Sequence, residues 1–203
     1  MTYEDHLAIL IDLAIEHQIP LQVHVDQTNT PEEDGTERLI EAVRWKITAS
    51  LPEKRRPRVW AVHAIFSGHS EERRTRIIHG LAENNIGVIC CPHAAISMRQ
   101  RRDKTAPIHN CIAPVRELLS GGVEVRLGTD NIRDLFMPLP ASPLLMREID
   151  VLASSIRYYN ESVLGKIARG ERLNETDLDS INKSLDGDYE AFGWPRTGRP
   201  NGR

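Results

Sequence analysis

The sequence predicts an α/β protein in which four parallel strands are covered by outer helices, which amounts to half of a (β/α)8 barrel. Two observations favour this fold class. Nearly continuous apolar runs, typical of strands buried in a parallel sheet, alternate with stretches whose apolar residues recur at helical spacing. Only four such units are found in the 203 residues, whereas a complete barrel has eight units and about 250 residues.

The expected elements follow in a regular order. Thr2 is the predicted N-cap of the first helix, with Asp5 at the capping-box position, and Pro20 marks where that helix has ended. The expected strands are residues 21–26, 59–63, 87–91 and 123–129. The expected helices around them are residues 1–18, 37–49, 70–84 and 112–119.

The second half of the chain contains two long loops and a helical end. Residues 92–107 form an expected loop that is longer than most strand–helix connections, which makes it a candidate for function. A Pro- and Leu-rich loop, 131–143, precedes a mostly helical remainder. We expect residues 1–192 to form a partial barrel with C-terminal helices. The Gly-, Pro- and Arg-rich residues 193–203 are predicted to be a disordered tail.

Composition gives little support for a nucleic-acid or membrane partner. The net charge of -3 gives no electrostatic argument for nucleic acid, and the basic clusters 54–56 and 99–102 are typical of solvated surface. No apolar run approaches the length of a membrane span. An odd number of cysteines, with Cys90 and Cys91 adjacent in an expected strand, favours a reduced protein. The sequence therefore predicts a cytoplasmic protein without a nucleic-acid or membrane partner.

Polar side chains of catalytic type end three of the four expected strands: His24, His63 and Asp130. Ligands bind at the carboxyl ends of parallel strands, so we expect these three to converge. Imidazole and carboxylate groups suit a divalent ion such as zinc or iron. Each residue alone has a structural alternative, a hydrogen-bonded histidine or an aspartate in a turn or helix cap. The repeated placement favours a site.

Several loop residues are weaker candidates. His69 and His93 lie in expected loops near this edge and could contact a substrate, although exposed loop histidines without a function are common. Residues 98–100 could reach the same ligand. Asn131 could position Asp130 or a substrate, or cap the following helix.

The motifs His-Val-Asp-Gln at 24–27, the histidine that ends the second strand and Gly-Thr-Asp-Asn at 128–131 resemble the amidohydrolase superfamily, in particular its cytosine deaminase branch. The resemblance covers roughly residues 1–150. It implies the C-terminal half of a TIM (β/α)8 barrel and a hydrolase that acts on carbon–nitrogen bonds other than peptide bonds. The implied reaction is cytosine deaminase-like deamination, or amide hydrolysis of a small cyclic compound, with zinc or iron as cofactor.

The resemblance also implies roles for single residues. His24 would ligate the metal, and Asp130 would touch the metal and shuttle a proton to the leaving group. His63 would orient or deprotonate the attacking water. Gln27 is a candidate for catalysis and substrate binding. His93 and Asn131 are further candidates for substrate binding.

Two departures from the family pattern matter. The His-x-His pair of the family's first strand occurs nowhere in the chain, and Gln27 stands where deaminases of this branch have Glu. Glutamine can form hydrogen bonds with a substrate but cannot donate a proton as a carboxylic acid does. We therefore expect the chain alone to be incomplete and inactive. The alternative is a catalytically silent remnant that binds a small molecule or dimerises.

Half a barrel also leaves open edges and one uncovered face of the sheet. Unpaired strand edges and apolar faces seek partners, which predicts a homo-oligomer or an N-terminal half-barrel partner. On the uncovered face we expect exposed apolar residues, namely Val23, Val25, Val62, Ile89, Val125 or their neighbours.

Overall fold

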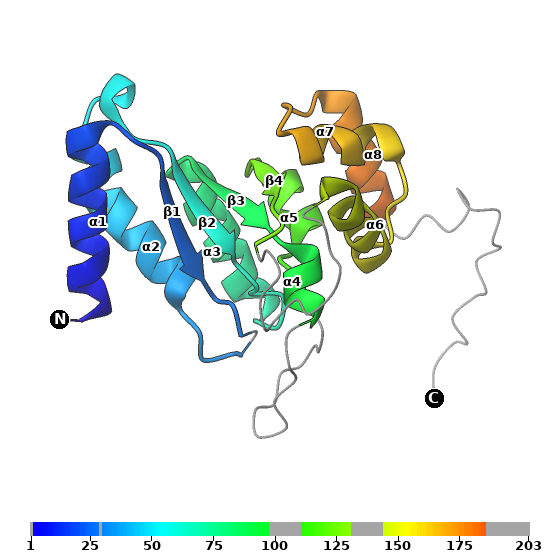
Figure 1. Cartoon of the computed structure of the whole chain (residues 1–203), viewed down its shortest axis with the longest axis horizontal. Helices are drawn as coiled ribbons and strands as arrows, with labels where there is room; N and C mark the ends of the chain where they lie inside the picture. The colour runs from blue at the N-terminus through cyan, green and yellow to red at the C-terminus, as the bar shows by residue number, and fades with distance from the viewer. Residues whose placement is uncertain (1, 29, 98–110, 131–143, 186–203) are drawn as a thin grey trace.

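The computed structural model describes residues 2–28, 30–97, 111–130 and 144–185 (Figure 1). The expected loop 131–143, most of the expected loop 92–107 and the expected disordered tail lie outside these residues. So does the candidate site residue Asn131.

Four parallel strands form one sheet in sequence order, as predicted. They are β1 (Leu21–Val25), β2 (Val59–His63), β3 (Ile86–Cys90) and β4 (Val125–Leu127). The register places Gln22 beside Trp60 and Trp60 beside Gly87, and two residues further along the strands His24 lies beside Val62. The carboxyl ends of β1 and β2 therefore lie at the same edge.

Helices cover one side of this sheet (Figure 1). Thr2 and Asp5 form the expected capping box at the start of the first helix. The long connecting helices are α1 (Tyr3–His17), α2 (Gly35–Val43) and α3 (Glu71–Glu83). Shorter elements are the π-helical turn η1 (Arg44–Thr48), the 3-10 turn η2 (Glu53–Arg55), α4 (Pro92–Ser97) and α5 (Val115–Ser120). The prediction of a loop from residue 92 was wrong for its first six residues, which form α4.

The C-terminal part is helical, as expected, with α6 (Leu145–Ile156), α7 (Glu161–Arg169) and α8 (Glu175–Leu185). Both α6 and α7 pack against β4, and α8 packs against α5. Among the described residues, none of the helices combines the length and the apolar character that crossing a membrane requires.

The main core lies between the sheet and the helices. On β1, the side chains at 21, 23 and 25 are buried there and those at 22 and 24 are exposed on the other face. The expected exposure of valines on the uncovered face was therefore wrong for Val23, Val25 and Val125, which belong to the main core. Val62 does face the open side but is 4% exposed, because it packs with Cys91 and Ala94, and Ile89 is half-buried against them.

Candidate metal site at the carboxyl edge of the sheet

His24 is the first residue of the site in the sequence. It lies on β1 on the face without a helical layer and is exposed. Its neighbours Val23 and Val25 are buried on the opposite face, so the strand alternation itself directs the imidazole away from the helices. The apolar pattern of β1 thus positions a polar ring on the open face.

His63 reaches the same place by a different route. Its neighbour Val62 is the residue paired with His24, so regular alternation would turn the side chain of His63 toward the helices. Instead His63 and Ala64 both have positive φ, 70° and 49°. This uncommon backbone conformation lets His63 Nε2 lie 3.2 Å from His24 Nδ1. The two rings meet edge to face, with centroids 4.9 Å apart.

Asp130 completes the group. It follows β4 with a positive φ of 57°, and its Oδ2 lies 3.7 Å from His63 Nε2. One ligand atom from each of His24, His63 and Asp130 lies within 4.8 Å of the others. The structure thus brings together the three residues that the sequence singled out at strand ends.

Burial shifts the pKa of His63. Its side chain is 1% exposed, and desolvation lowers the pKa of His63, with the nearby His24 acting in the same direction and Asp130 in the opposite one. His63 Nδ1 is buried without a hydrogen-bond partner among the described residues. A lowered pKa favours the neutral imidazole, the form that binds metals or accepts a proton.

The donor set fits a divalent metal ion. Two imidazole nitrogens and one carboxylate oxygen are common zinc and iron ligands. Ligand atoms at about 2.0–2.2 Å from one ion lie no more than about 4.4 Å apart. The His24–His63 and His63–Asp130 separations, 3.2 and 3.7 Å, meet this limit, and the ligand atoms of all three side chains lie within 4.8 Å of one another, slightly beyond it. The three side chains could therefore hold one metal ion.

Asp26, two residues after His24, has a structural role. Its carboxylate accepts hydrogen bonds from the backbone N–H groups of Gly35 and Thr36, at 2.7 and 3.0 Å, and from the Thr36 hydroxyl. Burial raises the pKa of Asp26, while these hydrogen bonds act in the opposite direction. Asp26 thus ties the end of β1 to the start of α2 and holds the loop after His24 in place.

Contacts from α3 also hold the loop after His24 in place. Arg73 forms an ion pair with Glu37 and donates hydrogen bonds to the carbonyl oxygens of Pro31 and Glu33, both at 2.7 Å. His69, expected in an exposed loop, is instead 6% exposed and packs near Phe66. Burial, with Arg73 adding to it, lowers the pKa of His69. These contacts favour a structural role for His69.

Glu148 is a buried carboxylate near the site that the sequence did not reveal. It lies on α6, is 2% exposed, and accepts a hydrogen bond of 2.9 Å from the backbone N–H of His93. Burial raises the pKa of Glu148, and the charge of Asp130 adds to this effect. Burial, with Asp130 and Glu148, also raises the pKa of Cys91 to about 12, so this thiol stays protonated.

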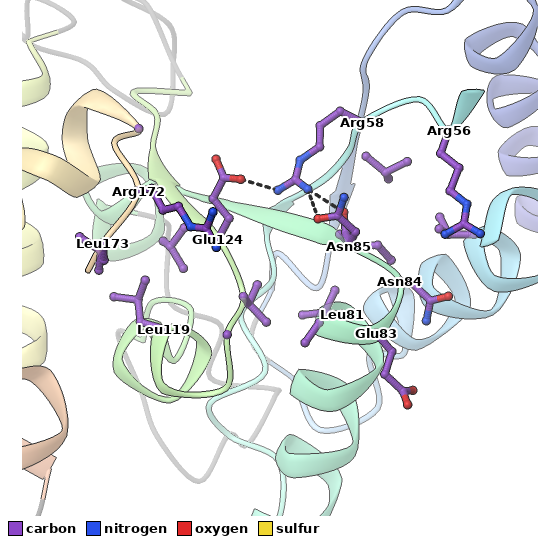
Figure 2. Close-up of a pocket in the computed structure, with 18 of the residues that line it drawn as sticks. Arg56, Arg58, Leu81, Glu83, Asn84, Asn85, Leu119, Glu124, Arg172 and Leu173 are labelled. Atoms are coloured by element: carbon purple, nitrogen blue, oxygen red, sulfur yellow. Dashed lines mark hydrogen bonds and ion pairs between the residues drawn. The ribbon is translucent and has the colours of Figure 1, made fainter. Parts of the chain in front are cut away.

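The remaining candidates lie at or near the same edge. Gln27 follows Asp26 and is half-buried, and His93 is the second residue of the short helix α4 rather than lying in a loop. A hollow of about 380 Å³ borders His24 and is also lined by Tyr3 and Arg38. A larger one, of about 920 Å³, lies between residues such as Arg58, Asn85 and Glu124 (Figure 2). His24 borders the smaller hollow, none of the three donor residues borders the larger one, and His63 and Asp130 line neither.

Comparisons with known proteins support the fold. No family model matches the chain. The chain is 32% identical over 112 residues to an uncharacterized protein of Haemophilus influenzae, a match that covers 55% of this chain and 38% of the relative. Two crystal structures of 5-methylcytosine deaminase from Klebsiella pneumoniae, with 5-fluorocytosine and with phosphonocytosine, are similar at TM-scores of 0.67 and identities of 22% and 21%.

The deaminase structures match 92% and 91% of this chain but only 42% of their own chain. The protein is thus an α/β chain whose four parallel strands resemble part of a cytosine deaminase barrel, as predicted. It spans less than half the length of the relative and of the solved deaminase.

Proposed function

We propose that the chain is the metal-binding part of a hydrolase that acts on carbon–nitrogen bonds other than peptide bonds. The observation that carries this proposal is the convergence of His24, His63 and Asp130 at the carboxyl edge of the sheet. The edge is the usual place for catalytic groups in barrels of this kind. The similarity to 5-methylcytosine deaminase favours a small ring compound with an exocyclic amine or an amide as the substrate.

Each residue then has a role in the proposed reaction. His24 and Asp130 would hold the metal ion, for which zinc and iron are the candidates. A bound ion would supply Lewis acidity that activates a water molecule. His63, whose pKa burial lowers, would orient this water and accept its proton as the water oxygen forms a bond to the substrate carbon. Asp130, 3.7 Å from His63, would pass this proton to the leaving nitrogen, which departs as ammonia or an amine when its bond to the carbon breaks.

Substrate contacts would come from the segments around the donors. Gln27 can form hydrogen bonds with a ring nitrogen or carbonyl through its amide, but cannot act as a general acid. His93 is fixed by the hydrogen bond from its backbone N–H to Glu148. We propose Gln27, His93 and Asn131 as contacts to substrate.

The proposed site is incomplete in this chain. A catalytic zinc normally has three protein ligands and a water in a cavity that limits access of solvent. Here His24 is exposed, and the chain lacks a His-x-His pair that could add ligands. We therefore propose that four further strands are needed for turnover.

Metal binding by the purified chain tests the proposal. After removal of metals with a chelator, zinc binding is measured by calorimetry and by metal analysis for the wild type, His24→Ala and Asp130→Asn. We expect weak binding of one ion per chain, and a loss of affinity of about tenfold or more in each variant. The matched control is His79→Ala, because His79 lies exposed on α3. Equal binding by all four proteins would contradict the proposal.

The absent His-x-His pair favours a second candidate, a catalytically silent binding module. Ammonia release from cytosine, 5-methylcytosine and simple cyclic amides separates the two. The wild-type chain alone should release none at a measurable rate. If the chain supplemented with a complementary half-barrel also releases none, while zinc still binds through His24 and Asp130, the silent module is the better description.

A further inference from the structure

The open face of the sheet carries an aromatic ring between two arginines. Trp60 on β2 lies over Gly87 of β3, so close that a side chain at position 87 would collide with the indole ring. The guanidinium groups of Arg58 and Arg126 lie 4.6 and 4.5 Å from the indole ring centroid. Trp60 is only 6% exposed, although it is not part of the main core, and it makes cation–π contacts with both arginines.

One carboxylate forms ion pairs with both arginines. Glu124 lies 2.7 Å from Arg58 and 2.8 Å from Arg126. Arg58 also donates a hydrogen bond of 2.9 Å to the backbone oxygen of Asn85 (Figure 2). The cluster of Arg58, Arg126 and Glu124 thus has two positive charges and one negative charge. The side chains of Arg126 and Glu124 are still 47% and 41% exposed, which solvates the excess charge.

The side of the molecule formed by β1 and α1 also leaves a strand edge and apolar side chains exposed. One flank of α1 pairs with α2 and η1 through Glu4–Arg38 and Asp12–Lys46. The opposite flank carries exposed apolar residues, Ile9 at 47%, Leu10 at 39% and Leu13 at 43%. Figure 1 shows α1 as the outermost element on the side of β1. In the described part of the chain, β1 pairs only with β2.

We propose that this face and edge dock a second (β/α)4 half-barrel that lays a parallel strand along β1 and presents a carboxylate to the Arg58–Arg126 pair. Closing the sheet into a barrel would remove the cluster from water, and burying an uncompensated charge is costly. The docked half must therefore supply the missing negative charge. Its neighbouring helix would cover Ile9, Leu10 and Leu13.

Charge decides between this occupant and a second copy of the chain. Two copies facing one another would bring four guanidinium groups and two carboxylates into one interior, which doubles the excess positive charge. A different half-barrel with an inward acidic residue neutralises the excess positive charge of a single copy. The inference deepens the proposed function, because the same half would enclose His24. It does not depend on the proposed chemistry.

The test uses a probe whose charge can be chosen. The segment of the Klebsiella 5-methylcytosine deaminase outside the part that this chain matches is produced in two forms. One carries Glu and the other Lys at the inward strand position that faces Arg126 after superposition. Association with the full 203-residue chain is measured by co-purification and light scattering with a chelator present, so that neither metal nor turnover contributes.

We expect one-to-one association, at least about tenfold tighter for the Glu form than for the Lys form. Arg126→Gln should remove the preference and Arg126→Glu should reverse it. Leu13→Asp should weaken both complexes, while Arg76→Glu, on the exposed surface of α3, should change neither. Circular dichroism verifies that each variant is folded.

Three results would overturn the inference. These are equal affinity for the two forms, no association with either form at about 100 µM, and a stable homodimer of the wild-type chain that Arg126→Glu alters. A failure here leaves zinc binding by His24 and Asp130 unaffected, and loss of that zinc site leaves this association unaffected. The two proposals can therefore fail separately.

Discussion

The two faces of the sheet are made by the same four strands but are stabilised in different ways. The helix-covered face is apolar and contributes Leu21, Val23 and Val25 to a continuous core with the helices. The open face carries His24, Trp60 and Arg126 instead. Burial of apolar surface holds the first face together, whereas stacking, ion pairs and the small cluster around Val62 hold the second. Side chains that stabilise the core therefore alternate along the strands with side chains that carry the candidate site.

A core truncation on each face should give the largest difference. Leu39 on α2 is 0% exposed in the main core, so Leu39→Ala should lower the free energy of unfolding by about 2–5 kcal/mol. Ile89 on the open face is only half-buried, and Ile89→Ala should cost at least about 1 kcal/mol less. Urea denaturation of both variants measures the difference. Similar losses would show that the open face is as tightly packed as the core.

The two strand-end aspartates provide the next test. Asp26→Asn places an amide among three hydrogen-bond donors and should destabilise the protein by about 2–3 kcal/mol. Asp130→Asn should change stability by no more than about 0.5 kcal/mol while it weakens zinc binding. Thermal denaturation with a chelator and zinc calorimetry separate the two effects. The reverse pattern would exchange the roles assigned to Asp26 and Asp130.

Gly87→Ala tests the open face alone. The added Cβ would lie 2.4 Å from the indole ring of Trp60, so the ring must move away from the arginines, at a cost of about 1–3 kcal/mol. Tryptophan fluorescence should shift to longer wavelength as the ring becomes exposed. Gly165→Ala is the matched control, because in α7 the added atom meets only the flexible side chain of Arg169. It should be neutral or slightly stabilising.

The strands and two of the three donors follow from local rules. Continuous apolar runs located all four strands to within about two residues, and the preference of ligands for carboxyl edges predicted that His24, His63 and Asp130 would converge. The prediction of which side chains of β1 lie on the open face was wrong, because it placed the valines there. Gln22 and His24 indicate the opposite alternation, since polar residues on a five-residue strand favour the face without helices.

Other features depend on information that a local pattern lacks. Alternation alone would direct His63 toward the helices, and only the positive φ at His63 and Ala64 returns it to the site. Glu148 lies in an ordinary amphipathic helix, so its burial beside His93 arises from the packing of α6 on α4. Long-range packing and backbone strain, rather than composition, decide these positions.

The smallest expected effect concerns the pH dependence contributed by Glu148, which lies where α6 meets the open face. Because burial raises the pKa of Glu148 above its ordinary value, its carboxyl group is harder to ionise in the folded chain than in the unfolded chain. Its contribution to stability is complete below the unfolded pKa and declines as the pH rises through the folded pKa.

Glu148→Gln keeps an oxygen that can accept the hydrogen bond from His93 N–H but cannot ionise. The variant should therefore gain stability relative to the wild type as the pH rises above the ordinary pKa of a glutamate, as measured by urea denaturation with a chelator present. Glu72→Gln, with an exposed carboxylate on α3, should show no comparable change with pH. A difference between Glu148→Gln and the wild type that stays constant as the pH rises would mean that Glu148 ionises as freely in the folded chain as in the unfolded one, and that the environment around His93 and Asp130 is more solvated than its burial indicates.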